Sequence, residues 1–322
     1  ISPNATKKEI QMTYILTFME KYPDLVSLMK ATEHNSSFHA EGSVWTHTCM
    51  VYNYCRQTHP DNKILALTAL LHDIGKCYVG FEENGKTRFT GHEGYSTFLA
   101  ISILDHFDLT NEEKIEILNI ISLHGVNLSA INASENLKAF RLADIAGRIS
   151  TQTRQDYEPR KFLPIPTNKE HKVHLLIGLP AAGKSTFANF LGLPRISRDQ
   201  IIQDMYPDFT YNQAFSTVQS STALLQLVNQ KLERLESNYA KTRTDCVIDM
   251  TNTSLSSRRK HMSKFPNAEF HAHVFLPSME TIQLRNTQRK GKIIPEEAYT
   301  GMMKSFVMPI KEEGFSQISY IL

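Results

Sequence analysis

The sequence has few cysteines and no long apolar run, and these two lacks limit the class of protein. Its four cysteines stand apart and form no CxxC pair. A secreted disulfide framework would be denser, so we expect reduced thiols in a cytosol-like compartment. The longest apolar run, at 64–71, falls short of the roughly 18 residues needed to span a bilayer and is typical of a buried helix. We therefore predict a cytoplasmic protein that does not bind membranes.

There is also little net charge, because the formal value is only +2 over 322 residues. This is too small for a protein that binds nucleic acid through a global positive field. A nucleic-acid substrate would have to be met by local basic patches. The chain has no internal repeat and no low-complexity tract, and its length allows two domains.

The hydrophobic pattern changes along the chain. In the first half apolar residues recur every three or four positions, which predicts helices over 10–19, 44–54, 64–71, 98–107, 115–123 and 137–149. After residue 173, predicted strands (173–178, 246–250, 270–276) alternate with predicted helices (184–191, 212–238, 281–288, 296–306). Such alternation implies a parallel sheet covered on both faces.

A proline-rich segment separates the two patterns. It reads YEPRKFLPIPT over 157–167, and its three prolines exclude a helix interior and stiffen the chain. We therefore predict two domains: an all-α helical bundle over 1–156 and an α/β domain with a parallel sheet over 171–322. A linker over 157–170 would join them.

The first motif with clear chemistry is a phosphate-binding loop. Residues 178–185 read GLPAAGKS and match GxxxxGK[ST], with a predicted strand before them and a predicted helix after them. In such a loop backbone N–H groups surround one anion at a helix start, the lysine reaches the β- and γ-phosphates, and the serine hydroxyl holds Mg²⁺. We therefore predict an ATP- and Mg²⁺-dependent phosphotransferase. Its nucleotide contacts would be Gly178, Ala181, Ala182, Gly183, Lys184, Ser185 and Thr186.

Three further segments resemble the polynucleotide 5′-kinase family. The first contains Arg198 and Asp199, and the aspartate would accept the proton of an attacking hydroxyl. The second follows a predicted strand and would place Asp249, Thr251 and Asn252 near the phosphates. The third, at 285–295, looks like the family's lid, in which Arg285 and Arg289 would meet ATP and Arg289 would stabilise the charge that develops during transfer.

The resemblance has one departure, and two of its assignments have alternatives. The family usually carries an arginine three residues after the aspartate, but here that position is Ile202. Arg195 and Arg198 are the candidates to take its place. Asp199 could instead cap a helix, and Asp249 could be a Mg²⁺-side residue. Basic residues near the expected acceptor path are Arg258, Arg259, Lys260, Arg285, Arg289, Lys290 and Lys292. They either track a phosphate backbone or are solvated charges or ATP contacts.

Histidines and aspartates on apolar helical segments form a second pattern in the first half. Burying imidazoles and carboxylates in a bundle is costly unless they share a metal or hydrogen bonds. These ligands suit a divalent transition metal such as Mn²⁺, Ni²⁺, Co²⁺, Fe²⁺ or Zn²⁺. His34, His59 and His106 we interpret as ordinary histidines. The candidates are His47, the doublet His72-Asp73, His92, His124 and Asp144.

The order H…HD…H…H…D resembles the HD-domain metal phosphohydrolases, over roughly 44–148. The resemblance implies that His47, His72, Asp73 and Asp144 bind a metal that activates water for attack on phosphorus. It also implies that His92 and His124 bind a second metal or the substrate phosphate, and that Lys76 contacts phosphate. Whether one ion or two are bound stays open.

Together the halves resemble the bifunctional HD-domain polynucleotide kinases of RNA end healing. The resemblance implies phosphorylation of a 5′-hydroxyl end and removal of a 2′/3′ or 2′,3′-cyclic phosphate, with RNA favoured over DNA and a separate ligase as the next enzyme. The alternative is a small-molecule or nucleoside kinase fused to an HD nucleotidase or a nucleotide-sensing domain.

Overall fold

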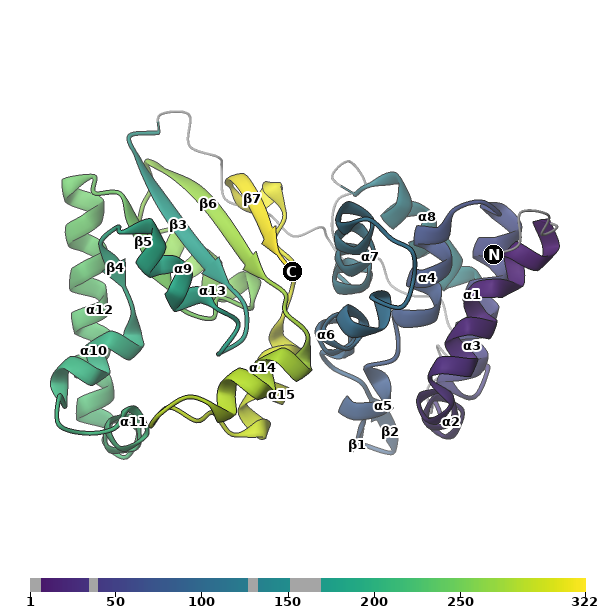
Figure 1. The fold of residues 1–322 in the computed structure, drawn as a ribbon, viewed down its shortest axis with the longest axis horizontal. Coiled ribbons are helices and arrows are strands. Elements are labelled where there is room, and N and C mark those ends of the chain that lie inside the picture. Colours follow the sequence, from purple (N-terminus) through teal and green to yellow (C-terminus); the bar gives the residue numbers. More distant parts are fainter. Residues whose placement is uncertain (1–6, 35–39, 127–132, 151–168) are drawn as a thin grey trace. The chain divides into compact units, whose positions relative to one another are not determined.

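The computed structural model describes residues 7–34, 40–126, 133–150 and 169–322, with side chains from Tyr14 onward. The chain divides into two compact units, Ile1–Arg160 and Lys161–Leu322 (Figure 1). The predicted linker lies, up to residue 168, outside the described residues. Among the described helices, none is long and apolar enough to cross a membrane.

The first unit is helical, apart from one short antiparallel hairpin of β1 (Phe81–Glu83) and β2 (Lys86–Arg88). Helix α4 is its centre, since every side chain from Leu65 to Leu71 is buried and the helix packs against α1, α3, α7 and α8. Polar caps begin several of the helices, as when Asn62 accepts a hydrogen bond from the backbone N–H of Leu65. The helices are α1 (Lys7–Lys21), α2 (Pro23–Ala31), α3 (Val44–Thr58), α4 (Lys63–Leu71), α5 (Lys76–Val79), α6 (His92–Leu104), α7 (Asn111–Leu123) and α8 (Glu135–Ala146).

The second unit is built on a five-stranded sheet in the order β4-β5-β3-β6-β7, and all its strand pairs are parallel. The strands are β3 (His171–Ile177), β4 (Arg195–Ile196), β5 (Cys246–Asp249), β6 (Ala268–Phe275) and β7 (Phe315–Ile321). The helices are α9 (Lys184–Leu191), α10 (Arg198–Met205), α11 (Tyr211–Gln219), α12 (Thr222–Thr242), α13 (Leu255–Met262), α14 (Met279–Thr287) and α15 (Glu296–Ser305), followed by a 3₁₀ turn, η2 (Lys311–Glu313).

The connections of this sheet predict a ligand site at the carboxyl ends of its strands. The crossover through α9 runs from β3 toward β4, whereas the crossover through α13 runs from β5 toward β6, so the two helices cover opposite faces (Figure 1). Ligands of open α/β sheets bind at the carboxyl ends of the strands where the winding reverses. The predicted phosphate-binding loop leaves β3 at this point.

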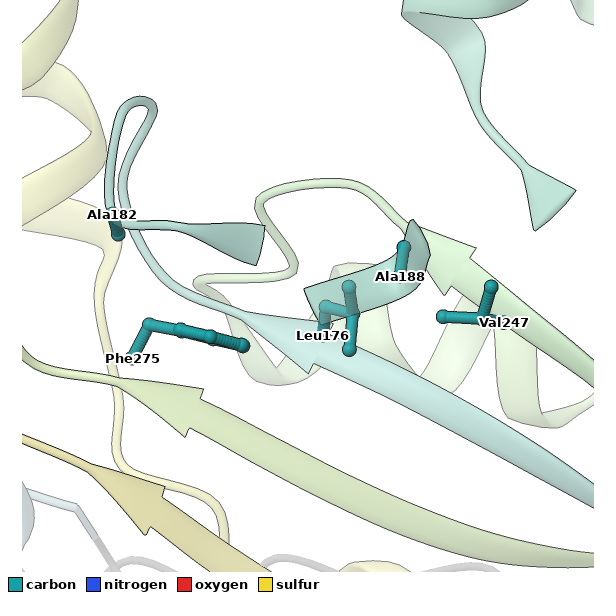
Figure 2. Close-up of a cluster of buried hydrophobic side chains, with 5 residues drawn as sticks. All are labelled: Leu176, Ala182, Ala188, Val247 and Phe275. Atoms are coloured by element: carbon teal, nitrogen blue, oxygen red, sulfur yellow. The ribbon is translucent and has the colours of Figure 1, made fainter. Parts of the chain in front are cut away.

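A cluster of buried apolar side chains fixes the phosphate-binding loop and α9 on the sheet. Figure 2 shows Leu176 of β3, Ala182 of the loop, Ala188 of α9, Val247 of β5 and Phe275 of β6. All five are at most 4% exposed. The start of α9 is therefore held by packing from three strands.

The predicted fold class is confirmed, but several elements are missing from the prediction or divided differently. The predicted helix over 212–238 is two helices, because Ser221 accepts a hydrogen bond from the N–H of Leu224 and begins α12 as a new helix. The prediction missed α10, a mostly polar helix that buries only Ile201 and Ile202. It also missed α2, the β1–β2 hairpin, the two-residue strand β4 and the edge strand β7.

Candidate functional sites

The metal-ligand candidates of the first unit converge in its interior. They lie on or beside helices that are far apart in sequence, and three of the four histidines stand at a helix end, where the chain can present a ring to a common centre. The residues are His47 on α3, His72 and Asp73 at the end of α4, His92 at the first position of α6, His124 at the end of α7, and Asp144 on α8.

Four of these residues form a first donor group. His47 Nε2 lies 3.1 Å from Asp144 Oδ1 and 3.7 Å from Asp73 Oδ2. His72 Nε2 lies 3.2 Å from Asp73 Oδ2 and 3.9 Å from Asp144 Oδ1. The two imidazoles and two carboxylates thus face each other, with all four side chains at most 8% exposed.

Asp73 joins this group to a second one. Its Oδ1 lies 3.2 Å from His92 Nε2 and 4.0 Å from His124 Nε2, and the two Nε2 atoms are 3.3 Å apart. The donor atoms within each set, His47–His72–Asp73 and Asp73–His92–His124, are close enough together to hold one metal ion. Asp73 belongs to both sets, so the residues would fit one or two divalent cations.

All four rings are oriented in the same way. Each Nδ1 lies within hydrogen-bond distance of a backbone carbonyl, which leaves Nε2 directed at the donor group. Metal-binding histidines are commonly fixed by such a contact at the other ring nitrogen. The pairs are His47 with Gly147 at 3.0 Å, His72 with Ala69 at 3.0 Å, His92 with Phe89 at 2.9 Å, and His124 with Ile121 at 2.7 Å.

Two buried atoms of this cluster, His72 Nε2 and Asp73 Oδ1, make no hydrogen bond of good geometry among the described residues, although each has a polar atom 3.2 Å away. Leaving such atoms unpaired in a protein interior costs about 1–3 kcal/mol each. A divalent cation would satisfy both, because imidazole nitrogen and carboxylate oxygen are its common ligands. The residues present therefore fit the predicted metal.

The local electrostatics also favour a cation. Burial alone would lower the pKa of His47, but the carboxylates of Asp144 and Glu41 outweigh it and raise that pKa to about 9. Burial would raise the pKa of Asp73, but His72 and Lys76 hold it well below its usual range. Both carboxylates of the cluster are thus ionised at neutral pH.

Several neighbours of the cluster were not foreseen. Glu41 Oε1 lies 3.0 Å from His47 Nδ1, and the Arg148 guanidinium bonds the second oxygen of Asp144. His34, interpreted as an ordinary histidine, is buried, with Nε2 3.3 Å from the ammonium of Lys76. Arg148 follows the end of α8 and lies four positions after Asp144, and this spacing was the available signal. Glu41 and His34 lie in no periodic pattern.

In the second unit the predicted phosphate-binding loop lies between β3 and α9. A Cβ at Gly178 would lie 2.9 Å from the carbonyl oxygen of Phe275, so only glycine fits there. Gly183, at φ 105°, begins α9, and Ala181 has a φ of 63°. A non-glycine residue in the left-handed region is a form of strain that collects at functional sites.

Lys184 is almost fully buried at the start of α9 and closes the loop on itself. Its ammonium donates to the carbonyl oxygens of Gly178 at 2.9 Å and Leu179 at 2.6 Å. Burial lowers its pKa to about 8, because the nearby carboxylates of Asp249 and Asp199 only partly offset the loss of hydration. A polyphosphate at this loop would supply the missing negative charge.

The loop borders a cavity of 1260 Å³. Most of the predicted kinase residues line this one cavity, although they come from four separate segments of the chain. They are Ala181, Ala182, Gly183, Lys184, Ser185, Thr186, Asp199, Asp249, Thr251, Arg285 and Arg289.

Arg289 is the group in this cavity that most clearly lacks an anion. Its Nη1 is buried and has no hydrogen-bond partner among the described residues. Arg285, one helical turn before it, only approaches the carbonyl of Ala182 at 3.4 Å. Arg285 and Arg289 thus present guanidinium donors to the cavity, so the residues present fit ATP.

Asp199 does not cap a helix, which was the alternative to its role as the base. Ser197 caps α10, with its hydroxyl accepting from the N–H of Gln200 at 3.3 Å, so the interpretation of Asp199 as the cap is wrong. The Asp199 carboxylate instead accepts hydrogen bonds from Tyr211 at 2.6 Å and from Lys292 at 2.5 Å. Sequence reasoning did not pair these three residues.

Other predicted residues lie away from the cavity. Gly178 supports the loop through its carbonyl, as described above. Arg198 donates to Asn229 Oδ1 at 2.6 Å, and the Asn252 amide donates to the Leu176 carbonyl at 2.8 Å. Neither Arg198 nor Asn252 lines the cavity, so a direct phosphate contact by either is not supported by its geometry.

The interpretation of Arg258 as a residue of the acceptor path is wrong. Its side chain is fully buried and forms a two-pronged pair with Glu313, at 2.7 and 2.8 Å. Its Nη1 donates to the carbonyls of Asn252, Thr253 and Val307. Arg258 therefore holds together the segments that follow β5 and α15.

Fold and sites together define an enzyme with a metal-binding phosphohydrolase domain and a nucleotide-binding kinase-like domain. Residues 44–149 match the family model of the HD domain, and residues 173–309 match that of an AAA domain. The chain thus carries an HD domain followed by a P-loop domain of the AAA class. These domains imply ATP and divalent metal as cofactors.

Individual relatives are distant. The chain is 23% identical over 176 residues to human heterogeneous nuclear ribonucleoprotein U-like protein 2, which covers 50% of this chain and 23% of that protein. A chain of the Pnkp1/Rnl/Hen1 RNA repair complex is 26% identical with a TM-score of 0.37, covering 43% of this chain and 45% of its own. A sugar kinase from Janibacter sp. HTCC2649 is 14% identical with a TM-score of 0.35, covering 47% and 85%. At such TM-scores neither structural likeness carries an argument about the substrate.

Proposed function

We propose that this chain heals broken polynucleotide ends, RNA in preference to DNA. The P-loop domain transfers the γ-phosphate of ATP to a 5′-hydroxyl end, and the HD domain removes a 2′- or 3′-phosphate, or opens and removes a 2′,3′-cyclic phosphate. The observation that carries the proposal is one chain in which a P-loop cavity holds Asp199 and Arg289 and a second domain holds a buried His–Asp cluster. The two reactions serve the two sides of one break and leave ends for a separate ligase.

In the kinase domain each part of phosphoryl transfer has a residue. Asp199 accepts the proton of the 5′-hydroxyl while the hydroxyl oxygen attacks the γ-phosphorus and ADP leaves. Lys184 and Arg289 stabilise the charge on the transferring phosphoryl oxygens. Ser185 and Asp249, which both line the cavity, are the residues that would hold Mg²⁺.

In the HD domain the cluster would hold one or two divalent transition-metal ions. A bound metal supplies activation of water and stabilisation of the leaving oxygen. The protein's part is to orient the ligands, since the carbonyl contacts at Nδ1 fix the rings of His47, His72, His92 and His124. Lys76, whose ammonium lies 2.7 Å from Asp73 Oδ2, adds positive charge for the substrate phosphate.

The experiment uses one short RNA with a 5′-hydroxyl and a 3′-phosphate. The full chain is incubated with this RNA, ATP, Mg²⁺ and either Mn²⁺ or Ni²⁺, and both ends are determined by mass spectrometry. We expect a phosphate to appear at the 5′ end and the 3′-phosphate to disappear. A DNA oligonucleotide of the same sequence should react more slowly.

An unchanged oligonucleotide, in a preparation that transfers phosphate from ATP to small hydroxyl compounds, would contradict the proposal. That outcome would identify the P-loop domain as a small-molecule or nucleoside kinase. The HD domain would then be a nucleotidase or a nucleotide-sensing domain.

A further inference from the structure

Both oxygens of the Asp199 carboxylate are already occupied. Oδ1 accepts a hydrogen bond from the Tyr211 hydroxyl at 2.6 Å, and Oδ2 accepts one from the Lys292 ammonium at 2.5 Å. The same ammonium lies 4.2 Å from the centre of the Tyr211 ring. A hydroxyl that is to give its proton to Asp199 must therefore share an oxygen with one of these two donors or displace it.

The position of Lys292 is set by the main chain around it. The segment between α14 and α15, which we call the lid, reaches the start of α11 (Figure 1). The Asn212 N–H donates to the Gly291 carbonyl at 2.9 Å, and the Asn212 amide donates to the Ile293 carbonyl at 3.0 Å. A Cβ at Gly291 would lie 2.9 Å from Thr210 Cβ, so glycine permits this approach. Lys292 is thus delivered to Asp199 by a docked lid.

A second cavity of 480 Å³ adjoins Asp199. It shares Ser185, Asp199 and Lys292 with the larger cavity, so a ligand there would meet the phosphate-binding loop across Asp199. Two further cations, Arg195 and Lys290, also line it. The three cationic side chains outnumber the two carboxylates that line this cavity, those of Asp199 and Asp249, so the lining favours a ligand that carries an anion.

We propose that the Lys292 ammonium changes its anionic partner during the reaction and thereby positions the acceptor. It holds the Asp199 carboxylate until the acceptor binds, and then passes to a phosphate of the acceptor that neighbours the reacting hydroxyl. The inference rests on the proposed kinase function and narrows its acceptor to a nucleoside that carries such a phosphate. An uncharged nucleoside or sugar would leave Lys292 on Asp199.

The exchange also makes Asp199 a better base at the moment it is needed. Partial burial would raise the pKa of Asp199, but Lys292 and Tyr211 outweigh it and hold the pKa below its usual value. Lys184 is the other charged group that lowers it. When the ammonium leaves, Asp199 Oδ2 takes the hydroxyl proton, the O–P bond forms, and the bond from the γ-phosphorus to the bridging oxygen of ADP breaks.

The test compares adenosine 3′-monophosphate with adenosine as acceptors for the full chain. We expect the wild type to prefer the nucleotide by at least about tenfold in kcat/KM, since a charge-assisted contact is lost with the nucleoside. Lys292→Met should remove most of that preference by raising KM for the nucleotide. Lys292→Arg, which keeps the positive charge, should retain part of the preference. Lys241→Met, an exposed change on α12, is the matched control.

A pH profile separates this role from a merely structural one. The acid limb of kcat/KM reports the base of the free enzyme. Since the ammonium lowers the pKa of Asp199, Lys292→Met should move that limb to higher pH. Tyr211→Phe should also move the limb to higher pH but keep the preference for the nucleotide.

A Lys292→Met enzyme with the wild-type preference and the wild-type acid limb would overturn the inference. So would a wild type that uses adenosine as well as the nucleotide while it phosphorylates RNA ends. If the wild type phosphorylates neither nucleotides nor RNA ends, the proposed function itself fails and the inference fails with it. If Lys292→Met does not fold, the acceptor preference and the acid limb are measured on Lys292→Gln instead.

Discussion

Two arginines of the α/β unit show how much the surroundings decide what a residue does. Arg258 is fully buried and engages Glu313 and three backbone carbonyls. Arg289 has a buried Nη1 without a partner among the described residues and faces the nucleotide cavity. Both stand in basic stretches of the sequence. The first stabilises the fold, and the second is available to an anion.

The buried pair predicts a large loss of stability for Arg258→Met. The change leaves the Glu313 carboxylate buried and unpaired, which typically costs about 3–5 kcal/mol. Urea unfolding of the full chain followed by far-UV circular dichroism measures it, and Lys260→Met on the same helix should change stability by less than about 0.5 kcal/mol. Arg258→Met combined with Glu313→Leu should cost less than Arg258→Met alone. Equal costs would show that the charge left unpaired is not the cause.

At the scale of elements, neighbouring strands β3 and β6 place histidines on the sheet face that carries α9. His174 Nδ1 lies 2.9 Å from His273 Nε2, and Phe187 of α9 packs against the His273 ring at 4.7 Å between centres. Burial, together with His174 and His271, lowers the pKa of His273 to about 4. The short helix α9 thus leaves part of its sheet face to be filled by neutral imidazoles.

This packing predicts that the α/β unit loses stability in mild acid. His273 titrates near 6.5 when unfolded and near 4 when folded, so its contribution is present above pH 6.5 and is lost as pH falls toward 4. Between pH 7 and pH 5 the loss should be about 2 kcal/mol. Urea unfolding at both pH values, followed by far-UV circular dichroism, checks this. The fluorescence of Trp45, the single tryptophan, follows the helical unit alone and so identifies the part of the transition that does not belong to the α/β unit. An unchanged pH dependence in His273→Gln would contradict it.

At the scale of the whole molecule, the two sites lie in separate units, each with its own core. The His–Asp cluster uses residues of the first unit only, and the P-loop cavity uses residues of the second only. The two sites are thus built from different sets of described residues.

Single changes should therefore remove one activity and spare the other. Lys184→Ala should lower phosphate transfer from ATP by at least about 10²-fold, since it removes a cation that stabilises the transferring phosphate, and should leave phosphate release unchanged. Asp73→Ala should abolish phosphate release and metal binding, measured by elemental analysis, and leave the kinase intact. Lys241→Ala and Asp105→Ala, at exposed positions, are matched controls. Loss of both activities from either change would argue against separate sites.

Much of this molecule follows from sequence because its signals are local. The strand, loop and helix around Lys184 occupy one continuous stretch, so the pattern GxxxxGKS identifies both the fold and the ligand class. The doublet His72-Asp73 closes an apolar helix, so its burial could be predicted. The change from helical to alternating periodicity likewise separates the two domain types.

What the sequence by itself determined were thus the motifs and the two domain classes, because each depends on residues near one another in the chain. Only the tertiary structure decided which side chains meet. It showed that His47 lies beside Asp144, 97 positions away, and that Lys292 pairs with Asp199. It also showed that Arg258 is buried in an ion pair with Glu313 and does not line the acceptor path. Such partnerships depend on helix packing and strand order, and no local spacing encodes them.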